Sequence, residues 1–354
     1  MPTPPIGLAI WGLHHQHPRW YWPLFGRLPQ LRPVCICDAD TDFLRHEAGF
    51  FGVDAHSDPA EMLARDDVEA VLVFVRHSEM PEAVARCVEA GKHVLVEKPM
   101  GASVAGVERV VAIARATDRV VTTGYYWRYD PMAGRVRQWI ADGLLGKVMH
   151  LEGRMNAQGP WRYVRDNALW MLEASERGGP MFNLGVHWID LFHWLTGLEV
   201  AAVSGRTSHA GGEPERTIED NAAALLEYEN EAIGLLDISY GLPRAWPLGR
   251  DFFIAIRGTL GCVHWTPSLG GEENDAVLVS EHASAGTPEP QRFQEPRPSV
   301  PGYCGQMGLD SLGDWARAIR SGGEVGIPVE AGLRAAVVAD AVLRSADERR
   351  RIVL

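Results

Sequence analysis

Short apolar runs recur along the first third of the chain and predict strands that are buried on both faces. The runs stand at Ile6–Ile10, Pro33–Cys37, Ala70–Val75, Lys92–Glu97 and Arg119–Thr123. Such runs are typical of parallel sheets, because helices cover both faces of the sheet. Between the third and fourth runs, Pro81–Ala90 has one apolar helical face, with a proline at its start and Gly91 at its end. This alternation predicts a doubly wound α/β domain.

The pattern changes after residue 125, where we expect a second, α+β domain over residues 126–354. Helices are predicted at Pro131–Asp142, Gly185–Leu195, Leu309–Arg320 and Val329–Ala346. Strands are predicted one after another, with short turns between them, at Ala222–Tyr228, Ala232–Tyr240, Asp251–Arg257 and Gly261–Trp265. Consecutive strands joined by short turns indicate an antiparallel sheet. Residues 267–302, rich in Gly, Pro, Ser and Glu, are interpreted as a long surface excursion.

Composition narrows the class of protein. A chain of 354 residues with 46% hydrophobic and 23% charged residues is typical of a globular protein of about two domains. The net charge of −12 argues against a nucleic-acid partner, and the basic run Arg349–Arg351 is interpreted as a solvated helix end. No apolar run approaches the roughly 20 residues of a membrane span, and the N-terminus lacks the basic region of a signal peptide. The five cysteines show no zinc-binding spacing, so we expect a reduced, cytoplasmic protein without a metal site.

The residues after the first two strands suggest a nucleotide site. In doubly wound sheets, ligands bind past the carboxyl ends of the strands. The first turn has glycine at only one position of the dinucleotide fingerprint, Gly12, where a missing side chain would let pyrophosphate approach the backbone. Asp38 follows Gly12 by 26 residues, close to the spacing of the acid that binds the adenosine ribose. Asp40 and Asp42 would repel a 2′-phosphate, so NAD is favoured over NADP; alternatively, Asp38 merely begins a loop.

Two further positions carry side chains suited to proton transfer. Lys98 stands at the end of the fourth strand, beside the ligand-binding edge, where an ammonium can donate to an alcohol or carbonyl oxygen. Asn183 and His187 are four residues apart on a predicted helix, and therefore on one face. A histidine there could be the general base that alcohol oxidation requires, although a helical histidine is also a common structural residue.

Six motifs together resemble the glucose–fructose oxidoreductase and inositol dehydrogenase family, Gfo/Idh/MocA, over nearly the whole chain. They are Ala90–Pro99, Gly124–Pro131, Gly143–Val148, Gly185–Asp190, Arg257–Gly261 and Ala341–Ala346. The resemblance implies a Rossmann domain followed by an open antiparallel sheet domain that often carries the oligomer interface. It further implies NAD or NADP as cofactor, a small carbohydrate-like substrate, and a homo-oligomer, either a dimer or a tetramer.

The resemblance also assigns residues to roles. It implies that Lys98 and His187 are the acid/base residues, with Asn183 where the family has an aspartate. A second departure is Met80, which stands where the family often has a histidine. Taken together with the motifs, the resemblance gives Gly12, His14, His15, Asp38, Glu97 and Lys98 as the expected cofactor residues, and Arg128, Trp161, Arg162 and Tyr163 as the expected substrate residues. A metal held by His14, His15 and His17 is disfavoured, because no further carboxylate follows nearby.

The resulting prediction is an NAD-dependent dehydrogenase that oxidises a secondary hydroxyl of a sugar, cyclitol or related polyol. Two alternatives stay open. One is a redox-neutral enzyme that oxidises a sugar transiently, and the other is an inactive, nucleotide-responsive regulator or scaffold of the same fold. The presence of Lys98 and His187 argues against the regulator, whereas Asn183 and Met80 argue for it.

Overall fold

The computed structural model describes residues 4–159, 161–165, 167–211, 216–268, 274–295 and 298–354. The chain divides into two compact units, each built from three separate segments. Unit 1 comprises Met1–Tyr126, Tyr163–Arg177 and Val300–Leu333, and unit 2 comprises Trp127–Arg162, Gly178–Ser299 and Arg334–Leu354.

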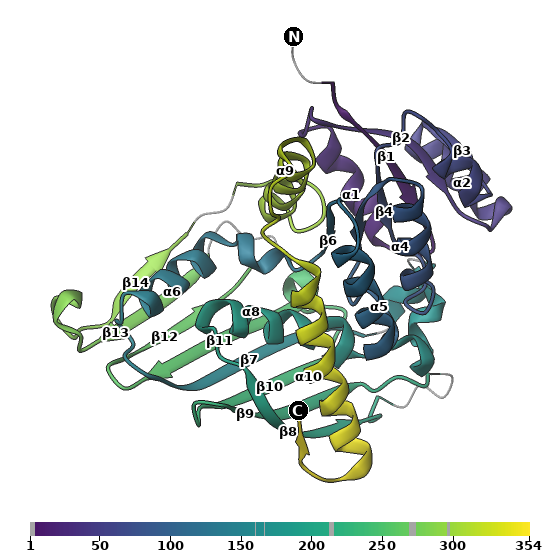
Figure 1. The fold of residues 1–354 in the computed structure, drawn as a ribbon. Helices are drawn as coiled ribbons and strands as arrows, with labels where there is room; N and C mark the ends of the chain where they lie inside the picture. The colour runs from purple at the N-terminus through teal and green to yellow at the C-terminus, as the bar shows by residue number, and fades with distance from the viewer. Residues whose placement is uncertain (1–3, 160, 166, 212–215, 269–273, 296–297) are drawn as a thin grey trace. The chain divides into compact units, whose positions relative to one another are not determined.

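Unit 1 contains a six-stranded, all-parallel sheet (Figure 1). Its strands are β1 (Ile6–Trp11), β2 (Leu31–Cys37), β3 (Asp54–His56), β4 (Ala70–Val73), β5 (His93–Val96) and β6 (Val121–Thr123). The spatial order β3-β2-β1-β4-β5-β6 reverses between β1 and β4, the kind of position where ligands bind in such sheets. All five predicted strands are confirmed, and β1, β4 and the end of β2 are wholly buried, which explains their unbroken apolar sequences.

The helices of unit 1 are α1 (His17–Phe25), α2 (Thr41–Phe51), α3 (Pro59–Leu63), α4 (Met80–Glu89), α5 (Val104–Arg115) and α9 (Gln306–Ser321). Three of them, α2, α3 and α5, begin at a residue whose side chain accepts from the first free N–H groups. Asp40 caps α2 by accepting from the N–H groups of Asp42 and Phe43, and Gly52, with φ +63°, ends it. The predicted helix at 81–90 is confirmed as α4. Met80 is the first residue of α4 and is wholly buried, so at this position the chain has a core side chain.

Unit 2 is organised around a nine-stranded sheet with the order β14-β13-β12-β11-β7-β10-β9-β8-β15. The strands are β7 (Val148–Gln158), β8 (Val200–Ser208), β9 (Asn221–Tyr228), β10 (Ile233–Leu242), β11 (Arg250–Gly258), β12 (Gly261–Thr266), β13 (Asp275–Ser280), β14 (Gln291–Gln294) and β15 (Ile352–Val353). The two-part fold class is confirmed. The sheet differs from the prediction in one respect, because β7 and β10 pair in parallel and the sheet is therefore mixed.

Helices cover one face of this sheet, and small residues on the strands let them approach. Helix α6 (Pro131–Ala141) packs beside α8 (Val186–Thr196), which lies over β7, and α10 (Val329–Glu348) runs beside β8 (Figure 1). A Cβ atom on Gly153 would lie 2.6 Å from the indole of Trp188, and one on Gly205 would lie 2.3 Å from the carbonyl oxygen of Val342. These two glycines are therefore required by helix-on-sheet packing.

The interpretation of residues 267–302 as a surface excursion is wrong for the two parts of that segment that form strands. Among its described residues, 275–280 and 291–294 form β13 and β14, which extend the sheet; residues 269–273 and 296–297 lie outside the described part. Asn274 is wholly buried, donates to Asp130 at 2.7 Å, and accepts from the indole of Trp265 at 2.5 Å. The composition of the segment, rich in Gly and Pro, predicted a loop. The strands form because they pair with the rest of the sheet, and those contacts come from residues distant in sequence.

Candidate functional site

The turn after β1 is held close to the end of β4 by Gly12. This residue has φ +94°, and a Cβ atom there would lie 2.6 Å from the backbone of Phe74 and Val75. Any other residue would push the two loops apart. Besides the predicted role of admitting pyrophosphate, Gly12 is needed for packing between the loops that flank the point where the strand order reverses.

The carboxylate of Asp38 lies against this turn. Its Oδ2 accepts from the N–H of Leu13 at 2.7 Å, and its Oδ1 accepts from the N–H of Asp40 at 3.0 Å. Nε2 of His14 lies 3.3 Å from Oδ2 of Asp40, and the His14 ring stacks on Phe43 with centroids 4.2 Å apart. The structure thus brings together Asp38 and His14, which the sequence assigned separately to a cofactor site.

A segment distant in sequence, residues 163–165 and 167–177, contacts the same turn; we call it the strap. The indole N–H of Trp170 donates to the carbonyl oxygen of His14 at 2.7 Å, and Nδ2 of Asn167 lies 2.9 Å from Nδ1 of His14. At the other end of the strap, Glu176 accepts from the N–H and hydroxyl of Ser78 at 2.9 and 2.7 Å, and from Arg76 at 3.0 Å. The strap therefore holds the loops after β1 and after β4.

Burial alone would raise the pKa of Glu176, but the hydrogen bonds from Ser78 and Arg76 outweigh it and lower that pKa below its usual value. Glu176 is consequently a carboxylate at neutral pH. Sequence reasoning missed it, because its partners lie about 100 positions earlier in the chain.

Four buried ionisable side chains gather where β1 and β5 end. Nδ1 of His15 accepts from the N–H of His17 at 3.0 Å, and Nδ1 of His17 lies 2.9 Å from Oε2 of Glu97. Oε1 of Glu97 accepts from the N–H of Lys98 at 3.2 Å, and Lys98 itself is only 3% exposed. The structure therefore brings the predicted residues His15, Glu97 and Lys98 to one end of the unit 1 sheet.

The charge state of this cluster follows from burial. Burial lowers the pKa of His15 well below its usual value, and the neighbouring His17 and Lys98 lower it further. Burial also raises the pKa of Glu97, which the positive charge of Lys98 partly opposes. His15 is consequently a neutral imidazole at pH 7, and its proton stands on Nε2 because Nδ1 is an acceptor.

His77, which sequence reasoning did not single out, joins this group from the loop after β4. Its Nδ1 donates to the carbonyl oxygen of Glu176 at 2.5 Å, and its ring packs edge-on against Trp170. Burial lowers the pKa of His77 to about 4, and the charge of Lys98 contributes. Nε2 of His77 is therefore a buried acceptor, and no hydrogen bond reaches it from the described residues. The sequence signal that could have identified His77 is its position in the polar turn that follows the predicted strand Ala70–Val75.

Unit 2 holds the predicted residues Asn183 and His187. Asn183 lies in a single π-helical turn, Met181–Gly185, which leads directly into α8 and includes the bond from the N–H of Val186 to the carbonyl oxygen of Met181. Both side chains are buried, at 5% and 9% exposure. Nδ2 of Asn183 donates to the hydroxyl of Tyr240 at 2.8 Å. Lys98 belongs to unit 1 and His187 to unit 2.

The predicted substrate residues fall into three different settings. Arg128 forms a buried bidentate ion pair with Asp190, with N–O distances of 2.9 and 2.5 Å, so its guanidinium braces the start of α6 against α8. Arg162 lies over the ring of Tyr240, 4.7 Å from its centroid, and Trp161 carries Arg244 over its own ring. Tyr163 is wholly buried in unit 1. Arg162 thus lies beside Tyr240, whose hydroxyl accepts from the side chain of Asn183.

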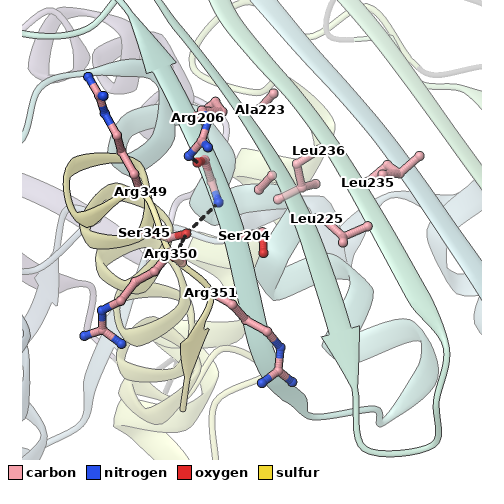
Figure 2. Close-up of a pocket in the computed structure, with 12 residues that line it drawn as sticks. Ser204, Arg206, Ala223, Leu225, Leu235, Leu236, Ser345, Arg349, Arg350 and Arg351 are labelled. Carbon is pink, nitrogen blue, oxygen red and sulfur yellow. Dashed lines mark hydrogen bonds between the residues drawn. The ribbon is translucent and has the colours of Figure 1, made fainter.

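Unit 2 also has a pocket of about 550 Å³ over β8, β9 and β10, beside the end of α10 (Figure 2). Leu225, Leu235 and Leu236 line its apolar side, and Arg349–Arg351 line the other. Arg351 makes two bonds of 2.7 Å to Glu227, so this arginine is paired locally. None of the residues predicted for cofactor, catalysis or substrate lines this pocket.

Among the described residues, no three or more His, Cys, Asp or Glu side chains are arranged to hold a metal ion. No helix in the described part of the chain is both long and apolar enough to cross a bilayer.

Comparisons with known proteins show the family of both parts of the chain. Residues 8–125 match the model of an oxidoreductase family with an NAD-binding Rossmann fold, and residues 134–264 match that of the GFO/IDH/MocA C-terminal domain. The chain is 27% identical to myo-inositol 2-dehydrogenase of Thermotoga maritima, over 90% of both chains. It is 24% identical to the NAD(+)-dependent scyllo-inositol 2-dehydrogenase of Bacillus subtilis, over 73% of this chain and 71% of that one.

Solved structures share the fold. Levoglucosan dehydrogenase in complex with NADH superposes with a TM-score of 0.82 at 19% identity and covers 98% of both chains. The aldose-aldose oxidoreductase of Caulobacter crescentus, solved with glycerol, superposes with a TM-score of 0.81 at 22% identity and covers 99% of this chain and 100% of that one.

Proposed function

Because the chain belongs to the Gfo/Idh/MocA oxidoreductase family, we propose that it is an NAD-dependent dehydrogenase that oxidises a secondary hydroxyl of a sugar, cyclitol or related polyol. The observation that carries the proposal is the buried group Lys98, Glu97 and His15 at the carboxyl ends of β5 and β1. Curated relatives named as inositol dehydrogenases support the substrate class. The same names favour net oxidation over the redox-neutral and regulatory alternatives.

The residues of unit 1 fit a dinucleotide. Asp38 uses two of its roughly four acceptor positions on Leu13 and Asp40, which leaves lone pairs for two ribose hydroxyls. The buried Nε2 of His77 is a second acceptor, suited to an N–H or O–H group of a bound molecule. When bound, NAD would supply the acceptor for the hydride that leaves the carbinol carbon.

The chain's own residues would handle the proton and the developing charge. We propose that His187 takes the hydroxyl proton as general base and that Lys98 stabilises the oxyanion as it forms. The 3% exposure of Lys98 supports its role, because a buried ammonium acts on a nearby oxygen with little screening by water. Asn183 would orient the base or the substrate by hydrogen bonding and bring no charge of its own.

The preference for NAD over NADP rests on the acids after β2. Asp38 and Asp40 lie together at the end of that strand, and Asp42 stands in the first turn of α2. A 2′-phosphate with nearly two negative charges would meet carboxylates there.

We further propose that the protein is a homo-oligomer, a dimer or tetramer, and that it acts in the cytoplasm. The resemblance supports the first statement. All five cysteines are free, and three of them are buried, which suits a reducing compartment.

The experiment that tests the proposed function is a panel of sugars and cyclitols with NAD. Absorbance of reduced cofactor and product mass are followed in parallel. Turnover with net NADH formation is expected. Product without net reduction would support the redox-neutral alternative, and NAD binding without product from any substrate would support the regulator.

A further inference from the structure

The carboxylate of Glu97 contacts two nitrogen atoms in the interior of unit 1. Oε1 accepts from the backbone N–H of Lys98 at 3.2 Å, and Oε2 lies 2.9 Å from Nδ1 of His17. The side chain of Glu97 is wholly buried and that of His17 is 6% exposed. One contact on each oxygen fixes the rotation of the carboxylate, and the proposed chemistry gives His17 no part so far.

One proton lies between His17 and Glu97. An imidazole nitrogen and a carboxylate oxygen both carry lone pairs, so a separation of 2.9 Å requires a proton on Nδ1 or on Oε2. A proton on Nδ1 leaves Glu97 negatively charged, whereas a proton on Oε2 makes it neutral. Burial raises the pKa of Glu97, and the charge of Lys98 and the bond from its backbone N–H both oppose that rise. A donor on Nδ1 of His17 opposes it as well, because a hydrogen bond to the carboxylate favours the charged form.

The charge of Glu97 matters because Lys98 is also buried. Lys98 is 3% exposed, so water does little to stabilise its ammonium group. Glu97 precedes Lys98 in the chain and is bonded to its backbone, and attraction between opposite charges is strong in an interior of low dielectric. A neutral Glu97 would remove this attraction, and Lys98 would then lose its proton more readily. The charge state of Lys98 is therefore coupled to the donor that faces Glu97.

Contacts on several sides hold the ring of His17 in place. Its backbone N–H donates to Nδ1 of His15 at 3.0 Å, and its ring centroid lies 4.0 Å from that of Tyr303 and 5.7 Å from that of Trp20. His17 is the first residue of α1, which follows β1, whereas Glu97 follows β5, and β4 lies between these two strands in the sheet. The contact thus joins the turn after β1 to the end of β5.

The other titratable groups around Glu97 come from every element packed against it. They are His15 from the turn after β1, Tyr21 from α1, His77 from the loop after β4, Lys98, and the phenols of Tyr126 and Tyr303, which lie beside Tyr21 and His17. Burial lowers the pKa of His15 and of His77, and burial raises the pKa of Tyr21. These three groups are therefore uncharged at pH 7, and the pair of His17 and Glu97 sets the balance of charge beside Lys98.

We propose that His17 is a positioning residue that holds the Glu97 carboxylate in its charged form beside Lys98, and so keeps Lys98 protonated for the reaction. This inference rests on the proposed function and deepens it. Lys98 remains the catalytic residue, and His17 acts on the reaction only through Glu97.

Two substitutions at position 17 separate this role from packing. His17→Phe keeps a ring beside Trp20 and Tyr303 and removes the donor, whereas His17→Asn removes the ring and keeps an N–H₂ group at about the place of Nδ1. At alkaline pH, His17→Phe should lower kcat by about tenfold, and His17→Asn should keep kcat within about threefold of the unaltered chain. The reverse order, a normal Phe variant and an impaired Asn variant, would show that only packing matters and would overturn the proposal.

The pH profile of kcat gives a second readout. Oxidation should slow at alkaline pH as Lys98 loses its proton. In His17→Phe this fall should move to lower pH by about one unit or more, because a neighbouring negative charge is lost, and in His17→Asn it should stay in place. The matched control is His46→Phe, which removes an imidazole that is 76% exposed and lies 3.9 Å from Glu47, and should leave the profile unmoved. A fall that does not move in His17→Phe would overturn the proposal.

A third measurement needs no substrate. In a chain labelled with ¹³C at the glutamate carboxyls, the signal of Glu97 is identified as the one missing from Glu97→Gln. This carboxyl should titrate about one pH unit or more higher in His17→Phe than in the unaltered chain, and should titrate as in the unaltered chain in His17→Asn. Equal titration in His17→Phe and the unaltered chain would overturn the proposal, even for an active enzyme. If the substrate panel fails and the titration moves, the proposed function is wrong and the role of His17 toward Glu97 stands, so the two failures are separable.

Discussion

The N–H of Leu13 donates to Oδ2 of Asp38 at 2.7 Å and thereby joins the turn after β1 to the end of β2. The bond places a carboxylate beside the turn where a dinucleotide would lie. It also shows that Asp38 is more than the first residue of a loop, because the side chain organises the backbone of another loop.

The first prediction concerns cofactor choice. NAD should bind at least about tenfold more tightly than NADP by calorimetry, because a 2′-phosphate would meet Asp38. Asp38→Ala should reduce this difference between the affinities for NAD and NADP. The control is Asp118→Ala, which removes a carboxylate whose side chain is 82% exposed and which stands before the start of β6, so it should change the ratio of the two affinities little. Equal affinities for NAD and NADP in the unaltered chain would contradict the ribose assignment.

The second prediction concerns Lys98. Lys98→Met keeps the length of the side chain and removes its donor, so kcat should fall by roughly 10²–10⁴. NAD affinity should change little. Lys92→Met is a suitable control. Lys92 stands just before the start of β5, at the end opposite Lys98, and donates to the carbonyl oxygen of Arg65. Normal turnover in Lys98→Met would show that a residue other than Lys98 stabilises the oxyanion.

The third prediction uses the amide at position 183. Asn183→Asp would bring a negative charge close to His187 along the helix and stabilise its protonated form. The rise of the oxidation rate with pH should then move to higher pH, because the base must be neutral to accept a proton. His187→Ala should abolish this rise of the rate with pH. A profile that does not move in Asn183→Asp would mean that the two side chains do not meet, or that His187 is not the titrating base.

The fourth prediction concerns stability and pH. Burial lowers the pKa of His77 in the folded chain to about 4, whereas in the unfolded chain His77 is protonated near pH 6.5. The stability that the folded chain draws from neutral His77 is therefore complete above pH 6.5 and is lost as the pH falls toward 4. His77→Gln should flatten the fall in unfolding free energy by up to about 1.4 kcal/mol per pH unit in this window. Denaturant titrations at several pH values measure this slope.

The control for this prediction is His46→Gln, since the His46 side chain is 76% exposed. It should leave the slope unchanged. If His77→Gln also leaves the slope unchanged, His77 is protonated in the folded chain and cannot be the buried acceptor that its contacts indicate.

The fifth prediction concerns the strap. Trp170→Phe keeps a ring against His77 and removes the N–H that donates to the His14 carbonyl. Because one hydrogen bond contributes about 1 kcal/mol, NAD should bind about fivefold more weakly, mainly through faster release. Trp246→Phe removes an equivalent indole bond, to the carbonyl of Arg250 in unit 2, and should leave NAD release unaffected. Stopped-flow fluorescence of NADH release distinguishes the two.

Sequence predicted those elements whose cause is local. The run Ala70–Val75 is uniformly apolar and contains β4. The helix predicted from Pro131 begins there, because the side chain of Asp130 caps α6 by accepting from the N–H of Met132. By contrast, β7 was missed, because its 11 residues, from Val148 to Gln158, mix charged and apolar side chains. Its outward side chains form cross-strand pairs, such as Glu152 with Arg257, that only the sheet reveals.

The site divides in the same way. Lys98 and Asp38 were predicted because each follows a strand that is evident from sequence. Glu176, His77 and Tyr240 were missed, because each matters through a partner 57 to 99 positions away. Met80 was noticed as a departure, and its complete burial in α4 supplies a packing reason for it.

The return of residues 300–333 to unit 1 has a consequence for dissecting the protein. Thr122 on β6 donates to the carbonyl oxygen of Ile327 at 2.8 Å and bridges to Pro328, and the Tyr303 ring lies 4.0 Å from that of His17. A fragment cut after residue 126 would lose all three contacts and expose the edge of β6. A stable nucleotide-binding half, or a chimera that exchanges this half between relatives, therefore has to be assembled from three stretches of the gene.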